Sequence, residues 1–174
     1  GHAGGEVASK LVCRVFSSYF VSHATATRPR PRLEQSLHAA NAAVADKIAQ
    51  NPDLRGMGCT LIAALKIDDR LSWVSVGDSI LFLFRDGKLS RLNVDHSVYG
   101  ELLQMVRDGK LSKAEADQHP KRNALRSAVT GKAISLIDLD AIDLRSGDLL
   151  LIATDGLETI SDSDIADILK KEER

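Results

Sequence analysis

Two aspartates in this chain follow short apolar runs and have a glycine directly beside them. Asp78 lies in Gly77-Asp78-Ser79, and Asp155 lies in Thr154-Asp155-Gly156. A strand fixes such a carboxylate, while the glycine lets the backbone turn away and leaves room for an ion and its waters. Carboxylate oxygens are hard ligands, so the pattern indicates Mg²⁺ or Mn²⁺ rather than Zn²⁺. Either aspartate alone could simply hydrogen-bond its own backbone in a turn, and only the pair favours a metal site.

Other catalytic chemistries have no matching pattern in the sequence. It contains neither a Gly-x-x-x-x-Gly-Lys-Ser/Thr phosphate loop nor a Gly-x-Ser-x-Gly nucleophile elbow. Cys13 and Cys59 form no Cys-x-x-Cys pair, and the five histidines lack the spacing of a zinc site. We interpret His96 and His119 as histidines that hydrogen-bond the backbone in turns. Metal-dependent chemistry through carboxylates is therefore the leading hypothesis.

Two amphipathic helices are predicted ahead of the first aspartate. Apolar residues recur at helical spacing over residues 6–20 and again over 33–48. Between them, the prolines within Thr25–Arg32 predict an exposed basic loop rather than a helix. A last helix, capped by Ser161 or Ser163, is predicted near the end of the chain.

Short apolar or alternating runs between the helices predict strands. They cover residues 60–67, 71–76, 80–84, 89–92, 134–139 and 149–153. Asp86-Gly87 predicts a type I′ hairpin turn, because both positions then need positive φ. Trp73 is predicted to pack in a core. Segregated helices and hairpin turns indicate an α+β domain rather than a doubly wound parallel sheet.

The stretch 97–125 is polar and weakly periodic, which predicts a small insertion over the main body. Within it, Tyr99–Val106 has a helical pattern, and Ser112 with Glu115 predicts a capping box at the start of a second short helix.

Length, composition and charge exclude several classes of protein. The 174 residues suit one domain, and 44% hydrophobic residues can form a core, which excludes global disorder. With 23 Lys and Arg against 24 Asp and Glu, and 4% aromatic residues, the sequence predicts no nucleic-acid partner. The apolar runs are too short for a membrane helix, so no membrane association is expected. Two cysteines and no apparent signal peptide favour a reducing, cytoplasmic compartment.

Several short motifs, in order along nearly the whole chain, resemble those of bacterial PP2C-type (PPM family) protein serine/threonine phosphatases. They are Gly1–Ser9, Gly56–Leu61, Val74–Ser79, Arg85–Gly87, Asp95–Ser97, His119–Asn123 and Thr154–Leu157. The resemblance implies two antiparallel sheets packed as a sandwich, flanked by helices, with a two-metal site at one end. It also implies hydrolysis of phosphoserine and phosphothreonine by attack of a metal-bridging water.

The resemblance assigns roles to individual residues. It makes Asp155 a direct ligand of the two ions, Mn²⁺ or Mg²⁺, and Asp78 the ligand of a further, weaker ion. It makes His2 a candidate for proton transfer. It matches the 97–125 insertion to the flap beside the substrate entrance. The implied partners are phosphoproteins, as substrates of a serine/threonine kinase.

The resemblance also places motifs of the family outside this sequence. The family's first Asp-Gly would precede Gly1, and its closing Asp-Asn would follow Arg174. We therefore expect residues 1–174 to form a single PP2C-like domain, truncated at both ends, that lacks its first and last strands. Because Asp155 and Asp78 return only two negative charges to two divalent ions, this segment alone is expected to be inactive.

Two other functions stay open from the sequence. A catalytically silent PP2C-like module would bind or regulate a phosphoprotein without hydrolysing it. A plain α+β interaction domain would require the ordered motifs to be accidental.

Overall fold

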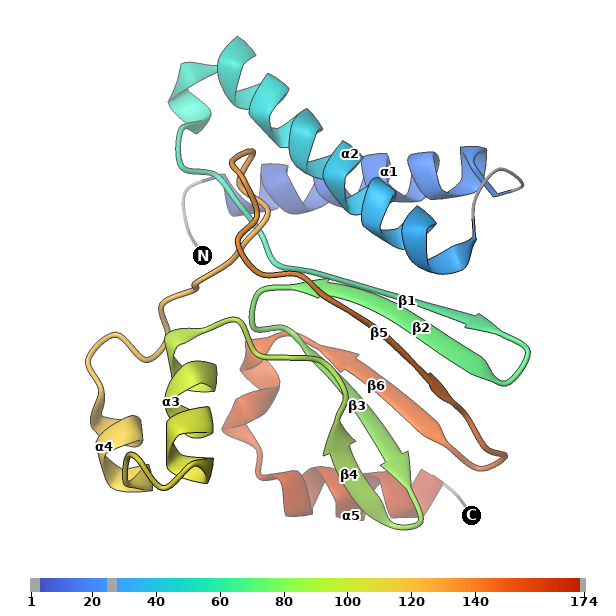
Figure 1. Cartoon of the computed structure of the whole chain (residues 1–174), viewed down its shortest axis with the longest axis vertical. Helices are drawn as coiled ribbons and strands as arrows, with labels where there is room; N and C mark the ends of the chain where they lie inside the picture. The colour runs from blue at the N-terminus through green and yellow to red at the C-terminus, as the bar shows by residue number, and fades with distance from the viewer. Residues whose placement is uncertain (1–3, 25–27, 173–174) are drawn as a thin grey trace.

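The chain folds into two antiparallel sheets packed face to face and flanked by helices (Figure 1). The computed structural model describes residues 4–24 and 28–172. The first sheet has the order β1 (Leu61–Ile67), β2 (Arg70–Val76) and β5 (Asp138–Asp143). The second has the order β4 (Lys88–Arg91), β3 (Ile80–Arg85) and β6 (Leu149–Ala153). The predicted two-sheet sandwich is confirmed.

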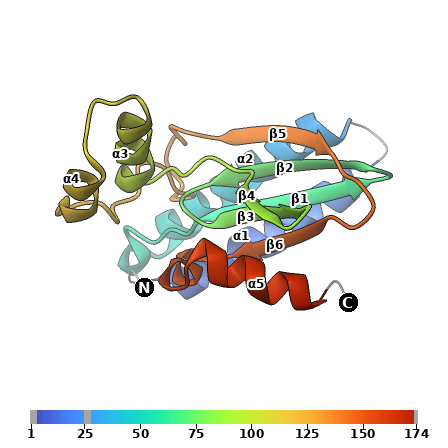
Figure 2. The same ribbon diagram turned by 90° about the horizontal axis from the view of Figure 1, so that it is seen from below.

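Helices cover the outer faces of both sheets (Figures 1 and 2). The helices α1 (Gly5–Ser22) and α2 (Pro29–Gln50) pack together and lie over the first sheet, and α5 (Asp162–Glu172) lies over the second. A short 3₁₀ helix, η1 (Pro52–Leu54), follows α2. Ser161 caps α5, since its Oγ accepts from the Asp164 N–H at 3.2 Å. None of the helices in the described part of the chain is long and apolar enough to cross a bilayer.

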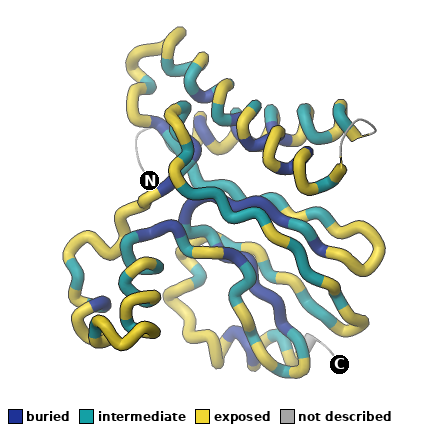
Figure 3. Tube along the Cα trace, in the orientation of Figure 1, coloured by how far each residue is buried: buried dark blue, intermediate teal, exposed yellow. Residues whose placement is uncertain are grey.

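Strand alternation divides the apolar side chains among three clusters, which Figure 3 shows as the buried middle of the fold. On β2, Val74 and Val76 face α1 and α2, while Leu71 and Trp73 face the second sheet. On β3, Leu81 faces the first sheet, and its neighbours Ile80 and Phe82 pack with Ile165 of α5. Trp73 is 1% exposed and donates from Nε1 to Asp138 Oδ2 at 2.9 Å, so its predicted core position is confirmed.

The prediction of a loop up to Arg32 is wrong, because α2 begins at Pro29. The first turn of a helix leaves its N–H groups without partners, so prolines at its start cost no hydrogen bond, and their fixed φ suits the helix. Arg32 is also not an exposed basic group. It is 7% exposed, with its guanidinium carbon 3.9 Å from the centre of the Phe20 ring.

The fifth strand lies at 138–143 rather than at the predicted 134–139. Ile134, Ile137 and Leu139 do pack against the α1–α2 core, which explains the apolar signal. Pairing with β2 continues instead into an acidic stretch, where Asp143 pairs with Arg70 and Asp138 accepts from Trp73. A prediction from apolar residues alone therefore places this strand too early in the sequence.

Three turns between consecutive strands, two of them hairpins, lie at one end of the sandwich (Figure 1). They join β1 to β2 at Asp68-Asp69, β3 to β4 at Asp86-Gly87, and β5 to β6 through Arg145–Asp148. Asp86 and Gly87 have φ of 51° and 74°, which confirms the predicted type I′ turn. Arg85 binds Asp148 through two hydrogen bonds of 2.8 and 2.6 Å and so ties two of these turns together. The ends of β2, β4 and β6 lie at the other end of the sandwich.

Between β4 and β5 the chain forms two helices, α3 (Val98–Arg107) and α4 (Lys113–Gln118), beside the sandwich (Figure 2). The capping box of Ser112 and Glu115 is confirmed, with each side chain bonded to the other's backbone N–H. No residue of α3 is buried, and Ala116 is the one buried residue of α4. The two helices pack mainly on each other.

We expect backbone amides of residues 98–118 to exchange with solvent about tenfold or more faster than those of β2 and β3. The reason is that opening α3 and α4 exposes little buried apolar surface, whereas opening β2 and β3 disrupts all three apolar clusters. Hydrogen exchange followed by mass spectrometry at peptide resolution measures the difference. Equal protection in the two regions would contradict the expectation.

Candidate functional site

The fold brings the two predicted aspartates to the same end of the second sheet. Ile80 of β3 pairs with Ala153 of β6. Asp78 lies two residues before Ile80, and Asp155 lies two residues after Ala153, so both flank one end of this strand pair. Burial raises the pKa of Asp78, and the negative charge of Asp155 raises it further. The two carboxylates therefore share one electrostatic environment.

Two further carboxylates, Asp95 and Glu158, join this pair. Asp95 follows β4, and Glu158 lies in the 3₁₀ helix η2 (Asp155–Thr159). Burial raises the pKa of Glu158, and so do the charges of Asp95, Asp78 and Asp155. Sequence reasoning missed Glu158 as a site residue, although a 3₁₀ turn brings residues three apart, such as Asp155 and Glu158, onto one side. We call Asp78, Asp95, Asp155 and Glu158 the acidic cluster.

One cation, Arg91 at the end of β4, contacts the acidic cluster. Its Nη1 lies 3.3 Å from Asp95 Oδ2 and 3.7 Å from Glu158 Oε1. Its Nη2 donates to the carbonyl oxygens of Asp78 at 2.9 Å and Ser79 at 3.3 Å. The charge of Arg91 lowers the pKa of both Asp78 and Glu158, against the larger effect of burial.

The turn that carries Asp78 is fixed by its neighbours. Gly77 is buried with φ of 105°, and a Cβ there would lie 2.3 Å from Thr60 Cγ2. The Gly77 backbone pairs with His96: its N–H donates to Nδ1 at 3.3 Å, and its carbonyl accepts from the His96 N–H at 3.0 Å. Thr60 and Ser79 share a 2.7 Å hydrogen bond between their hydroxyls. Asp78 is thus presented by a rigid backbone.

His96 and His119 both hydrogen-bond the backbone, as predicted. His96 is 4% exposed, and burial lowers its pKa, which favours the neutral imidazole that accepts from Gly77. His119 Nδ1 accepts from the Lys121 N–H at 3.3 Å. Neither ring is free to act as a metal ligand through its bonded nitrogen. His2, the predicted proton-transfer residue, lies outside the described residues.

The acidic cluster fits a hard divalent cation, although the described residues do not supply a complete set of ligands for one. Asp78 and Asp155 offer carboxylate oxygens where mutual repulsion makes a positive charge favourable. Over residues 4–24 and 28–172, the Asp155 carboxylate makes no hydrogen bond or ion pair with another side chain. The same residues contain no group of three or more His, Cys, Asp or Glu side chains placed to hold one ion.

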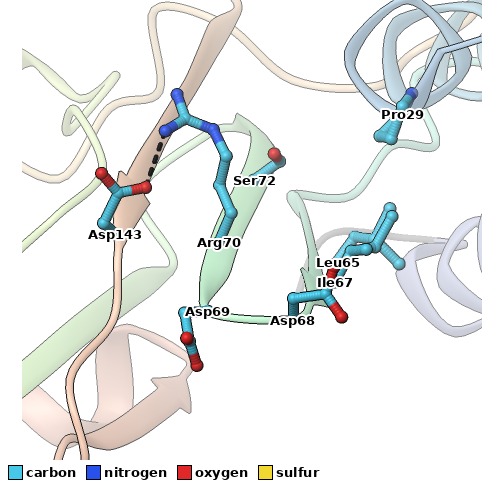
Figure 4. Close-up of a pocket in the computed structure, with 8 residues that line it drawn as sticks. All are labelled: Pro29, Leu65, Ile67, Asp68, Asp69, Arg70, Ser72 and Asp143. Atoms are coloured by element: carbon cyan, nitrogen blue, oxygen red, sulfur yellow. Dashed lines mark hydrogen bonds and ion pairs between the residues drawn. The ribbon is translucent and has the colours of Figure 1, made fainter.

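A separate hollow in the surface lies away from the acidic cluster. A pocket of about 390 Å³ lies at the hairpin-turn end, under the start of α2 (Figure 4). Its lining includes Asp68, Asp69 and the exposed ion pair of Arg70 with Asp143 at 2.8 Å. It holds none of the acidic cluster, so we do not assign the activity to it.

Known proteins match this chain along nearly its whole length. The family Protein phosphatase 2C matches residues 1–173. The serine/threonine protein phosphatase PstP of Mycobacterium tuberculosis is 35% identical over 98% of the chain, which spans only 32% of that protein. The serine/threonine phosphatase stp of Listeria welshimeri is 31% identical over 98% of the chain, which spans 68% of it.

Solved structures agree with the sequence matches. The crystal structure of M. tuberculosis PstP superposes with a TM-score of 0.82 at 34% identity, covering 96% of this chain and 69% of that one. The PstP catalytic domain in complex with two manganese ions superposes with a TM-score of 0.80 at 32% identity, covering 98% and 70%. On its sequence and on its fold, this chain belongs to the protein phosphatase 2C family.

Proposed function

We propose that the protein carrying this chain is a metal-dependent protein serine/threonine phosphatase that hydrolyses phosphoserine and phosphothreonine. The observation that supports this most is the convergence of Asp78 and Asp155 at the ends of β3 and β6 in a chain of the protein phosphatase 2C family. The manganese-bound relative supports the choice of ion.

In this proposal, each residue has a defined task. Asp155 would hold the catalytic ions, Mn²⁺ or Mg²⁺, and Asp78 would hold a further, weaker ion; among the described residues, neither carboxylate has a side-chain partner to give up first. When bound, the ions would supply the bridging water that attacks phosphorus. The turn around Gly77 keeps Asp78 in place. His2 would deliver the proton that the departing serine or threonine oxygen needs when its bond to phosphorus breaks.

The substrates in this proposal are cytoplasmic proteins that a serine/threonine kinase has phosphorylated. Residues 97–125 would act as a flap beside their entrance, because α3 and α4 lie beside the end of the sandwich that carries the acidic cluster (Figure 1). The formal charge of −1 gives no reason to expect a nucleic-acid partner.

We expect the intact protein to hydrolyse a phosphothreonine peptide and p-nitrophenyl phosphate only with Mn²⁺ or Mg²⁺. Removing metal with EDTA should lower the rate about 100-fold or more, and added Mn²⁺ should restore it, because the ions supply both the nucleophile and the charge neutralisation. Phosphate release measures both rates. Full activity after exhaustive EDTA treatment would refute the proposal.

A catalytically silent binding module is the second candidate. The lack of a three-ligand group among the described residues favours it. It predicts that the intact protein binds the phosphothreonine peptide, by fluorescence anisotropy, and releases no phosphate with any metal. The assay above therefore separates the two functions.

A further inference from the structure

Arg91 divides the acidic cluster into two pairs of carboxylates. It is in contact with Asp95 and Glu158, at 3.3 and 3.7 Å. Asp78 and Asp155 receive no hydrogen bond or ion pair from it through their carboxylates, although the Asp78 carbonyl does accept from it. The ion-pair contacts of Arg91 thus go to Asp95 and Glu158, and the carboxylates of Asp78 and Asp155 are left for another cation.

The guanidinium is directed into the protein rather than toward a ligand. Its side chain is 23% exposed, and Nε is buried without a partner among the described residues. Nη1 faces carboxylates and Nη2 faces two carbonyl oxygens of the turn at the start of β3. An arginine that recognises phosphate must offer free donors in a fork, whereas here both Nη groups are engaged and Nε is buried.

Charge counting shows what Arg91 does for the metal-free protein. Four carboxylates and one guanidinium give the cluster a formal charge of −3, and without Arg91 it would be −4. Each additional negative charge raises the repulsion among these neighbouring carboxylates and also raises their attraction for a divalent ion. Arg91 and a divalent ion therefore compete to neutralise the negative charge of the same carboxylates.

We infer that Arg91 is a positioning residue that restricts where a divalent ion binds. It retains Asp95 and Glu158 in ion pairs and holds the backbone of the turn that presents Asp78, so that the ion is left with Asp78 and Asp155. This inference rests on the proposed function, because the ion is the one that the phosphatase would use, but Mn²⁺ binding can be measured without phosphatase activity. It assigns Arg91 no contact with substrate.

The test compares Mn²⁺ binding to the metal-free intact protein in the wild type and in Arg91→Gln. Free Mn²⁺ is measured by electron paramagnetic resonance, and thermal melting is followed with and without Mn²⁺. We expect Arg91→Gln to bind its weakest Mn²⁺ about tenfold more tightly, since a positive charge is lost and two carboxylates are released. It should melt lower without metal and gain more from Mn²⁺ than the wild type does.

Two more variants separate charge from geometry. Arg91→Lys keeps the charge, so its Mn²⁺ affinity should stay within about threefold of the wild type. In Arg91→Gln/Glu158→Gln one released carboxylate is removed again, so affinity should return toward the wild-type value. A merely structural role for Arg91 would not produce this reversal. Arg70→Gln is the matched control, because Arg70 forms an exposed ion pair with Asp143 at the opposite end.

Weaker or unchanged Mn²⁺ binding in folded Arg91→Gln would overturn the inference. If that variant does not fold, Glu158→Gln decides. The inference expects an affinity within about threefold of the wild type there, against a loss beyond tenfold in Asp155→Asn; similar losses in both would overturn it. Absence of phosphate release by the wild type would refute the proposed function alone, because the Mn²⁺ comparison does not depend on turnover.

Discussion

In the intact protein, Asp155→Asn should lower kcat/KM for a phosphothreonine peptide about 100-fold or more in saturating Mn²⁺. An amide cannot supply the charge that a divalent ion requires, and the rate depends on that ion. The fold should persist, because the Asp155 carboxylate forms no side-chain hydrogen bond or ion pair within the described residues. Circular dichroism melting without metal should show a midpoint equal to or above that of the wild type.

Asp69→Asn provides the matched control for this substitution. Asp69 is an exposed aspartate in the β1–β2 turn, at the end of the sandwich away from the acidic cluster. Its variant should keep the wild-type kcat/KM within about twofold, since a surface change remote from the site seldom matters more. Near wild-type turnover in Asp155→Asn would remove Asp155 from the metal site.

Gly77→Ala should destabilise the protein by about 3 kcal/mol, a large part of a typical domain's stability. The new Cβ would lie 2.3 Å from Thr60 Cγ2 and 2.7 Å from Thr60 Cβ, which forces apart the ends of β1 and β2. The φ of 105° adds strain for any residue with a Cβ. Urea unfolding monitored by tryptophan fluorescence measures the change.

Gly109→Ala isolates the backbone contribution to that loss. Gly109 has φ of 70°, but a Cβ there would meet nothing within 4 Å. Only the cost of positive φ remains, about 1 kcal/mol. If the two alanine variants lost equal stability, the close approach of Thr60 to Gly77 would not be what fixes this turn.

Local sequence rules predicted much of the fold. Asp86-Gly87 determines its own turn, and Ser112 with Glu115 determines a helix start, because both devices operate within a few residues. A local rule gave the wrong prediction at Pro29, where α2 begins. Prolines break a helix interior, but at the first turn of α2 they are compatible with a helix.

The candidate site was only half predictable, because its other half depends on long-range pairing. Asp78 and Asp155 carry a local signal, a carboxylate beside glycine after an apolar run. Arg91 and Glu158 carry none. They meet because β3 pairs with both β4 and β6, which brings together residues 67 positions apart in sequence. The sequence pattern of a single segment does not contain that pairing.

The three turns at the far end of the sandwich are separated from the acidic cluster, which gives this fold a natural place for modification. A fluorophore or a short inserted tag at Asp68-Asp69 would sit at the opposite end of the sandwich from Asp78 and Asp155 (Figure 1). The turn is exposed, and surface turns accept insertions more readily than strands do. An immobilised or labelled form of the protein would therefore be attached there, with the ion-binding end directed into solution.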